Sequence, residues 1–491
     1  MGKKIPAWQV AMCLTVGIAL LAYSIFFGYG EAHMPLLLAA AFTVIVAMLN
    51  GWKWAYLEKG MIESVNRTMG ACLILLMVGV LVATWKAGGI IPTMIYYGLK
   101  ILNPHYFLIT AAVLCSIVSL VIGSSYTTAG TIGVALIGIS LGLGINPAMA
   151  AGAVVSGAYF GDKMSPMSDT TNLAPAVAGS NVFEHIRHMV YTVTPAYIIM
   201  IIILFFTGKS NGNIGDVKIT STLNTSIEKE FVITPLLMIP MVLLILAIVK
   251  KIPALPTMFI GSIMGMLCMG FVQHISFDKW FNIMHYGYHS QSNVKLTNSY
   301  TVADIIGGGG FNAMLWTISV CFASMCFAGA LECTGMLSTI SSTILRRAKT
   351  RGGLVLATIM TCFAMNCCTG DQYLSIIIPG RLYKEEFENR KLKAKNLSRC
   401  LEDCATVTSP LIPWNVCGLT MAGFLGIPTI IYFKYCYLNM LTPIISVIYG
   451  YIGFSMDEMS DDEYKKMLEN RLYEQEEKRR NMAESLGVEQ Y

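Results

Sequence analysis

Residues 157–175 read GAYFGDKMSPMSDTTNLAP and place two acids, a lysine and several hydroxyl side chains between apolar runs. If residues 148–160 and 173–180 are the halves of one membrane helix, the polar residues between them lie near the bilayer midplane, where an unpaired charge costs ~2.5–3.5 kcal/mol on insertion scales. Gly161, Pro166 and Pro175 favour an interruption of the helix here. Non-helical backbone at that depth is tolerated only where it lines a cavity inside the protein, so we expect the functional site in this stretch.

The composition indicates an integral membrane protein. Of 491 residues, 55% are hydrophobic and 13% are charged, and the mean hydropathy is +0.60, so a soluble fold would expose too much apolar surface. Apolar stretches of about 18 or more residues recur, each long enough to cross the hydrocarbon core as a helix. The net charge of +5 is dispersed over loops and tail, which argues for cytoplasmic anchoring and against nucleic-acid binding.

Basic residues between the apolar runs predict the topology. We expect an all-α polytopic membrane protein with about 10 spanning helices, two re-entrant hairpins and two interrupted helices. The basic loop 383–399 and a charged tail at 456–491 are predicted to lie in the cytoplasm, together with both chain termini. The polar segments 208–229 and 275–302 are predicted to lie outside the cell.

The chain divides into two halves with the same plan, residues 1–230 and 231–455. Because the charge count makes the second half enter from the opposite side, the two halves are predicted to form an inverted repeat. Such repeats bring hairpin tips and helix breaks to the midplane, where they bind substrates and coupling ions. The hairpins and broken helices are expected at 105–145 and 147–180 in the first half, and at 353–382 and 400–430 in the second.

Carboxylates at these breaks are the candidate ion carriers. A carboxylate removed from water can hold a proton, and sodium can displace that proton where neutral oxygens complete its shell. We therefore predict Asp162, Asp169 and Asp371 as proton carriers and sodium ligands. The neutral ligands predicted for these ions are Ser165, Ser168, Thr170, Thr171, Asn172, Thr369 and Gln372. The residues predicted to contact a substrate are Ser125, Thr127, Thr128, Asn366, Glu402, Thr408, Ser409, Trp414 and Asn415.

Structural roles compete with these assignments. Lys163 also fits an ion pair with the adjacent Asp162, and Asp169 also fits an N-cap of the second half-helix. The hydroxyl residues near position 125 also fit hydrogen bonds to backbone carbonyls across a helix interface. Four further residues fit a solvated, packing or interfacial position: Glu402, Asp403, Trp414 and His188.

Several of these motifs carry a family resemblance. Residues 157–176, the run Thr369-Gly-Asp-Gln-Tyr-Leu-Ser375, Leu401-Glu-Asp403 and residues 408–415 resemble the NhaC family of bacterial sodium/proton antiporters. The resemblance covers roughly residues 10–455. It implies membership of the ion transporter superfamily, with inverted repeats, paired hairpins, a homodimer and an elevator-like movement. It also implies no enzymatic activity and no cofactor beyond sodium and protons as transported or coupling ions.

The resemblance leaves the substrate open, because the same family includes sodium-coupled malate/lactate antiporters and amino-acid carriers. Sodium/proton exchange across the cell membrane is our first expectation, and transport of an organic acid or an amino acid is the alternative. Two other classes fit less well. An intramembrane aspartyl protease would need a Gly-x-Gly-Asp motif, but position 159 is Tyr. A channel would need a symmetric filter, which the sequence does not contain in an evident form.

Overall fold

The computed structural model describes residues 3–27, 32–210, 217–250, 252–292, 294–296, 301–469 and 471. Helices dominate these residues, and no β-strand occurs among them. Many of the helices are long and apolar. This confirms the predicted class, an all-α polytopic membrane protein.

The described part of the first half contains α1 (Ala7–Phe27), α2 (His33–Leu49), α3 (Trp54–Ala87), α4 (Ile90–Ile101), α5 (Phe107–Ile122), α6 (Ser125–Thr128), the π-helix η2 (Ala129–Gly133), α7 (Val134–Gly142), α8 (Pro147–Met164), α9 (Asp169–Ala178), α10 (Val182–Ser210) and α11 (Val217–Glu230). The second half contains α12 (Ile239–Val249), α13 (Ala254–Phe271), α14 (Trp280–Tyr286), α15 (Val302–Ile306), α16 (Phe311–Cys333), α17 (Met336–Leu345), α18 (Arg351–Thr369), α19 (Gln372–Asn389), α20 (Ala394–Leu401), the π-helix η5 (Glu402–Thr406), the 3-10 helix η6 (Ser409–Leu411), α21 (Val416–Leu425), α22 (Thr429–Tyr432) and α23 (Tyr437–Ile452). Four more 3-10 turns are Pro104–Tyr106, Pro235–Met238, Phe277–Lys279 and Phe433–Tyr435.

Seven of the described helices are long and apolar enough to cross a membrane, and nine if each of two bent pairs counts as one span. The expected count of about 10 spans also included α2, α13 and α23. These are apolar but belong to a shorter class of 10–17 residues, and a 17-residue helix is only about 26 Å long. The seven in turn include α5, the α6–α7 segment and α18, which the expected topology assigned to the two hairpins. The two counts therefore differ in which helices they include, and not in α2, α13 and α23 alone.

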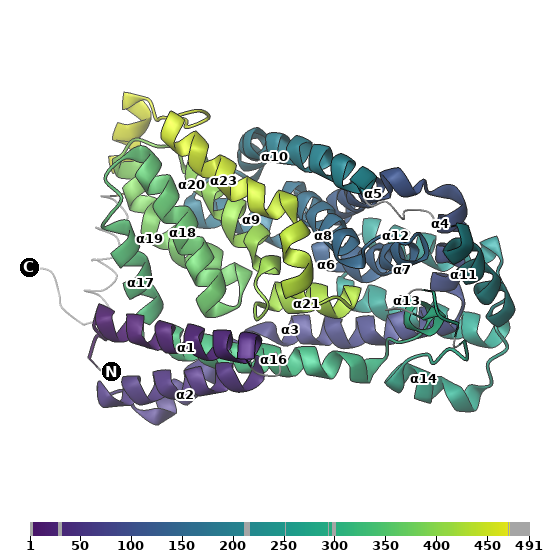
Figure 1. Cartoon of the computed structure of the whole chain (residues 1–491). Coiled ribbons are helices and arrows are strands. Elements are labelled where there is room, and N and C mark those ends of the chain that lie inside the picture. Colours follow the sequence, from purple (N-terminus) through teal and green to yellow (C-terminus); the bar gives the residue numbers. More distant parts are fainter. Residues whose placement is uncertain are drawn as a thin grey trace, which may run out of the picture.

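The helices lie in two layers (Figure 1). One layer holds α1, α2, α3 and α16, and the other holds α5, α8, α9 and α18–α20, with α21 beside α3 and α16. Helices α3 and α16 approach closely because glycines line their contact: a methyl group on Gly79 would lie 2.5 Å from the Gly310 carbonyl oxygen. The second layer has an apolar core of its own, which includes Leu354, Ile376 and Leu401.

Both halves contain an interrupted helix beside a sharp turn. Residues 165–168 separate α8 from α9, and residues 412–415 separate η6 from α21. The turn of the first half follows α5 at Gly123, and that of the second half joins α18 to α19 at Gly370; both glycines have a left-handed backbone, with φ of +74° and +62°. The inverted orientation of the two halves stays a prediction.

Helices α18 and α19 form an antiparallel hairpin whose tip is Gly370–Asp371. The hydroxyls of Thr361 and Tyr383 lie 2.7 Å apart across it, and Arg390 donates to the Thr350 carbonyl at 2.6 Å. Residues related by the tip are thus paired along the whole length of the hairpin. In the first half, α5 and the α6–α7 segment are each of spanning length, so the re-entrant assignment of 105–145 also stays a prediction.

The segment expected as an outer polar loop at 208–229 is partly helical, since Val217–Glu230 forms α11. Leu223 and Ile227, one turn apart, are both buried, and α11 contacts α4 and α7. This apolar pair anchors an otherwise polar helix, and the abundance of Ser and Thr conceals it in the sequence. Residues 211–216 lie outside the described residues.

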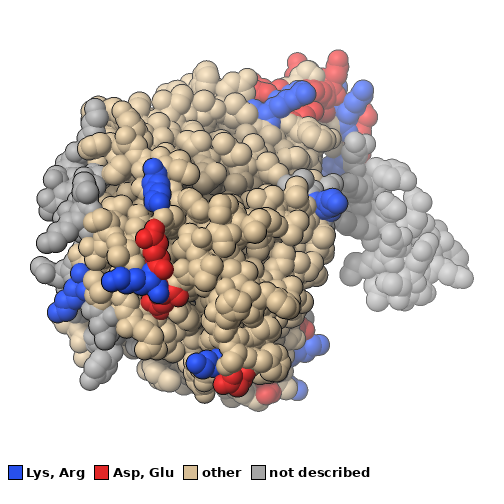
Figure 2. Space-filling model, turned by 90° about the vertical axis from the view of Figure 1, so that its right-hand side faces the viewer, with Lys and Arg blue, Asp and Glu red and all other residues tan. Residues whose placement is uncertain are grey.

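The basic loop after α19 lies at the same end of the molecule as the start of α1 (Figure 1). The described start of the tail is attached to this loop by ion pairs of Lys391 with Asp461 at 2.7 Å, Lys393 with Glu463 at 2.9 Å, and Lys395 with Asp457. Figure 2 views the opposite end, where the visible charged side chains are sparse and of both signs. The rest of the tail, 472–491, lies outside the described residues.

A candidate ion site at two broken helices

Asp162 lies in the last turn of α8, and three hydrogen-bond donors hold its carboxylate. Oδ2 accepts from the Ser125 backbone N–H at 3.1 Å and from the Ser125 hydroxyl at 2.6 Å, and Oδ1 accepts from the Ser168 hydroxyl at 2.6 Å. The residue is 7% exposed. Asp162 therefore connects the start of α6 to the break between α8 and α9.

The other polar residues of this break mainly hold its backbone. Thr171 and Asn172 donate to backbone carbonyls of residues 162–168 at 2.7–3.2 Å. Ser165 accepts from a backbone N–H two residues on, at 3.3 Å. Asp169 is exposed at the start of α9, where its charge favours the helix N-terminus. Ser165, Thr171 and Asn172 thus have local structural contacts. Asp169 is the first residue of α9, whose N-cap is Ser168, so the N-cap role considered for Asp169 is wrong.

Lys163 does not pair with its neighbour Asp162. Its ammonium group forms an ion pair with Asp403 of η5, and both side chains are completely buried. The same carboxylate oxygen accepts from the Thr192 hydroxyl at 3.0 Å. The expected Lys163–Asp162 pair is therefore wrong, because the helix directs adjacent side chains to different faces and Asp403 lies on the face that Lys163 meets.

Glu402 is also buried, in contrast to the solvated position that its basic neighbours suggested. It begins the π-helix η5 and has no exposed surface. Neither of its carboxylate oxygens has a hydrogen-bond partner within the described residues, and nor does the hydroxyl of Thr406. The Thr170 and Thr406 hydroxyls lie beside the carboxylate, and Lys163 and Asp162 are within electrostatic range.

The polar residues of the second break connect it to the tip of the α18–α19 hairpin. Asn366 donates to the Ala405 carbonyl at 2.7 Å, and Asn415 donates to the Asn366 side chain at 3.2 Å. The Trp414 indole N–H donates to the Cys367 carbonyl at 2.8 Å. The hydroxyls of Thr408 and Ser409 each donate to a backbone carbonyl of the preceding turn at 2.7 Å. Five residues predicted to contact a substrate thus have partners inside the protein: Asn366, Thr408, Ser409, Trp414 and Asn415.

The remaining predicted residues lie at the two tips. Asp371 caps α19 by accepting from the Leu374 N–H at 2.8 Å, and Thr369 donates to a carbonyl one turn earlier at 2.8 Å. Gln372 lies 3.5 Å from the Ser409 hydroxyl. At the first tip, Thr127 and Thr128 bond to Ser124 at 3.1 and 2.9 Å. The Thr128 bond to a backbone carbonyl fits the structural alternative for these hydroxyls, whereas Thr127 bonds to a side chain and Ser125 to the Asp162 carboxylate.

Aromatic residues that the sequence did not single out join the two halves. The Tyr126 hydroxyl donates to the Cys417 sulfur at 3.0 Å. Tyr373, at the start of α19, lies within electrostatic range of Asp162, Asp169 and Asp371. A joint role of the three predicted aspartates stays a prediction.

A buried charged chain continues from Asp403 toward the basic end of the molecule. Arg399 Nε lies 3.9 Å from Asp403 Oδ2, and the same guanidinium contacts His188 Nε2 at 3.2 Å and the Ser455 carbonyl at 2.7 Å. Arg399 has no exposed surface and His188 has 3%. Arg399, the last residue of the basic loop predicted at 383–399, is therefore buried, and so is His188, since α20, which carries Arg399, packs against α10, which carries His188.

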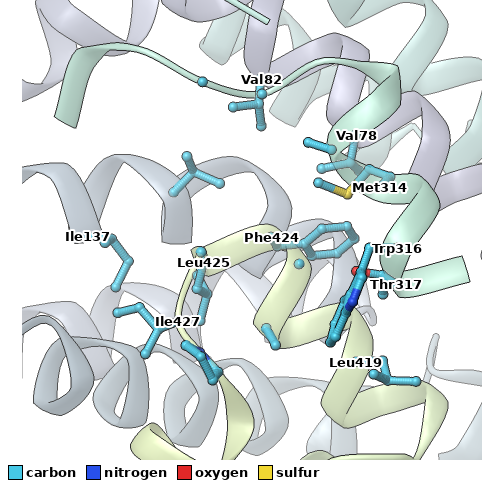
Figure 3. Close-up of a pocket in the computed structure, with 18 of the residues that line it drawn as sticks. Val78, Val82, Ile137, Met314, Trp316, Thr317, Leu419, Phe424, Leu425 and Ile427 are labelled. Atoms are coloured by element: carbon cyan, nitrogen blue, oxygen red, sulfur yellow. The ribbon is translucent and has the colours of Figure 1, made fainter. Parts of the chain in front are cut away.

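A cavity of about 690 Å³ lies next to the site but is chemically different. Figure 3 shows Val78, Met314, Phe424 and Leu425 pointing into it from α3, α16 and α21. Trp414 also lines it, whereas neither Asp162 nor Glu402 does. Most of the lining is apolar, which does not favour a naked ion, and the charged residues among it are Lys86 and Asp304.

The donor set suits a hard monovalent cation better than a transition metal. No group of three or more His, Cys, Asp and Glu side chains with metal-binding geometry occurs in the described ranges. Carboxylate and hydroxyl oxygens are present at the break, and these are the ligand types that bind hard cations.

Long apolar helices, interruptions in two of them and buried acids at those interruptions define a multi-pass secondary transporter. The model of the Na+/H+ antiporter family matches residues 157–454. The chain belongs to this family, and its relatives place it in the NhaC group; it is an antiporter and not an enzyme.

Three curated relatives illustrate the range of the family. The Na(+)/H(+) antiporter NhaC of Alkalihalophilus pseudofirmus is 35% identical over 93% of this chain and 98% of its own length. The arginine/ornithine antiporter ArcD of Halobacterium salinarum is 35% identical over 92% of each chain. The malate-2H(+)/Na(+)-lactate antiporter of Bacillus subtilis is 34% identical over 91% of this chain and 94% of its own.

Proposed function

We propose that this antiporter exchanges sodium for protons across the cell membrane. The observation that carries the proposal is an excess of buried carboxylate at the breaks: Asp162, Glu402 and Asp403 outnumber the buried bases Lys163 and Arg399 by one. An uncompensated charge in a low-dielectric interior is strongly unfavourable. A sodium ion or a proton bound there restores neutrality, and competition between the two for one place couples their movements.

The mechanism follows from this competition. The acids bind sodium on one side of the membrane, and a mobile unit that carries both turns shifts against the α1–α3–α16 layer. Sodium leaves on the other side and a proton replaces it before the return. Because the ionised and empty site carries an uncompensated charge, its return through the membrane is disfavoured, and this enforces exchange over leak.

The orientation belongs to the same proposal. The lysines of the loop after α19 lie at the end where α1 begins, as the positive-inside rule requires of a cytoplasmic face. Both termini are then cytoplasmic. We also propose a homodimer, which the family resemblance implies, and which crosslinking in native membranes would test.

Proteoliposomes with a pH-sensitive dye inside test the exchange. We expect a pulse of external NaCl to alkalinise the lumen, because sodium enters in exchange for protons that leave, and a choline chloride pulse of equal strength to do nothing. Asp162→Asn should abolish the signal, because it removes one of the acids and loosens the α8–α9 break. A sodium pulse that moves no protons through the wild-type protein would refute the proposal.

Transport of an amino acid or an organic acid is the second candidate, because identity to the arginine/ornithine antiporter equals that to the sodium/proton antiporter, at 35%. The malate-2H(+)/Na(+)-lactate antiporter is nearly as similar. The same vesicles loaded with ornithine or lactate decide between the candidates. Uptake of radiolabelled arginine or malate that depends on the internal substrate, without sodium-driven proton flux, would favour this second function.

A further inference from the structure

We propose that the transported cation binds at Glu402 together with the hydroxyls of Thr170 and Thr406, and that Asp162 is a positioning residue. This inference rests on the proposed function and assigns the cation to one of the buried acids. It differs from the sequence-based assignment, which made Asp162 the first ion ligand and Glu402 a substrate contact.

Within the described residues, Glu402 lacks the hydrogen bonds that a buried carboxylate usually accepts. A buried carboxylate normally has several donors, because an ionised group without them loses its hydration with no replacement. Glu402 is completely buried, and both of its oxygens lack a hydrogen-bond partner among the described residues. A bound cation would supply the missing interaction, and no rearrangement of the protein would be needed to free the oxygens.

Asp162 differs from Glu402 because its carboxylate already accepts three hydrogen bonds. Its two oxygens already accept one backbone N–H and two hydroxyl groups at 2.6–3.1 Å. These donors present positive hydrogen atoms to the carboxylate and hold it in place. A cation at Asp162 would have to displace these donors. The Ser125 bonds give Asp162 a structural role, because they connect the first tip to the first break.

Neutral hydroxyl oxygens lie close to the Glu402 carboxylate. The Thr406 hydroxyl is buried without a partner and lies beside Glu402, and the Thr170 hydroxyl lies on the other element that contacts it. Thr170 and Ser168 are 3.1 Å apart, and Ser168 donates to Asp162. The ligands for one ion thus come from both halves of the chain but lie in the layer that carries the two turns, so the proposed movement against the α1–α3–α16 layer would carry the site as a unit.

The backbone at Glu402 departs from the regular α-helix. Residues 402–406 form a π-helix, whose wider turn is energetically poor and is found mostly at functional sites. Side chains stabilise it: Asn366 donates to the Ala405 carbonyl at 2.7 Å, and Ser409 donates to the Thr406 carbonyl at 2.7 Å. The hairpin tip and the helix break therefore hold the segment that carries Glu402.

The charges around Glu402 support a single monovalent ion. Lys163 is held by Asp403, and Arg399 lies beyond Asp403 at 3.9 Å, next to His188. His185 lies nearby on α10, where it contacts the Ser398 hydroxyl at 2.9 Å. With the bases engaged in this way, one negative charge stays uncompensated, and one sodium ion neutralises it.

The test is sodium binding by the purified full-length protein in detergent, measured by isothermal titration calorimetry with NaCl in a choline chloride buffer. Glu402→Gln should weaken binding by at least about tenfold, the loss expected from removing one charged ligand. Thr406→Val should weaken it by a smaller factor, and Thr420→Val is its control, since that hydroxyl is also buried without a partner. Asp162→Asn should bind sodium with a similar stoichiometry while transport is lost.

The opposite pattern, in which Asp162→Asn abolishes binding and Glu402→Gln binds as the wild type does, would overturn the inference and leave the proposed exchange intact. If Glu402→Gln does not fold, Glu402→Asp keeps the charge but withdraws it by one methylene; unchanged affinity there would also count against Glu402. Wild-type protein that neither binds sodium nor moves protons on a sodium pulse would instead refute the proposed function.

Discussion

Asp162 and Glu402 are both buried acids at interrupted helices, yet their surroundings are opposite. Asp162 ends a regular helix and faces the tip of the first half, whose Ser125 supplies two of its three donors. Glu402 begins a π-helix, and neither oxygen is paired within the described residues. Burial alone therefore does not distinguish an ion ligand from a structural acid, whereas the number of hydrogen-bond donors does.

The largest expected effect concerns the buried ion pair of Lys163 and Asp403. Lys163→Met leaves Asp403 buried without its main partner, which should cost about 3–5 kcal/mol of unfolding free energy. SDS-induced unfolding followed by tryptophan fluorescence measures this change. The double variant Lys163→Met/Asp403→Leu should recover part of the loss, because Asp403 is no longer buried without its main partner, although Arg399 then lacks the carboxylate that lies 3.9 Å from its Nε. A single variant as stable as the wild type would show that the pair is not formed.

A direct comparison of the two acids should give a smaller difference of opposite sign. Asp162→Asn places an amide N–H₂ against groups that already donate, and should cost about 1–3 kcal/mol. Glu402→Gln removes a buried charge that has no donors, so stability in sodium-free buffer should stay equal or rise. The same unfolding assay applies to both. Destabilisation by Glu402→Gln larger than that by Asp162→Asn would remove the contrast between the sites.

The individual donors of Asp162 should each matter less. Ser168→Ala removes the hydroxyl that links Asp162 to Thr170 and should cost about 1 kcal/mol. Ser446→Ala is a matched control, because the Ser446 hydroxyl is buried without a partner and its loss should be neutral or favourable. Thermal unfolding in detergent would show both effects. Equal shifts for the two variants would mean that the Asp162 bonds contribute nothing to stability.

Local chemistry made part of this site predictable. The breaks follow from Pro166 and Pro410, which cannot continue a helix, and the sharp turns follow from Gly123 and Gly370, whose left-handed backbone other residues rarely adopt. Each of these signals lies within a few residues of its effect. The membrane class likewise follows from composition and the length of the apolar runs.

The partners of the charged residues were not predictable in the same way. Lys163 meets Asp403, 240 positions away, although an acid adjoins it in the sequence. Arg399 follows several solvated lysines and reads as one more cytoplasmic charge, but the packing of α20 against α10 encloses it with His188. The π-helix at Glu402 has no local signal of its own, because bonds from distant residues hold this part of the chain: Asn366 donates to the Ala405 carbonyl inside it and Asn439 to the Val407 carbonyl just after it.

The smallest expected effect concerns the exposed charges that attach the tail. Their response to pH and salt should differ from that of the buried acids. Lys393 beside Glu463 lowers the pKa of that carboxyl to about 2, and Lys395 lowers the pKa of Asp457, while Glu463 raises the pKa of Lys393. An acid with a lowered pKa contributes stability above its unfolded value of ~4.3, and that contribution is lost as the pH falls toward 2. A lysine with a raised pKa contributes below its unfolded value of ~10.4 and loses this above its folded pKa. Attachment of the tail should thus be constant between about pH 5 and 10.

Salt should release the tail where pH does not, because the Debye length falls from about 10 Å at 0.1 M to about 3 Å at 1 M. Hydrogen exchange of the full-length protein measures this at the Met459 amide, which donates to the Lys391 carbonyl at 2.7 Å. We expect faster exchange at 1 M salt, and the same acceleration at low salt in Lys391→Gln/Lys393→Gln, with Lys229→Gln on α11 as a distant control. Sodium and choline chloride should act alike here, since screening depends on ionic strength alone. A response to sodium only would mean that the tail reports occupation of the buried acids, and the separation between exposed and buried charge would fail.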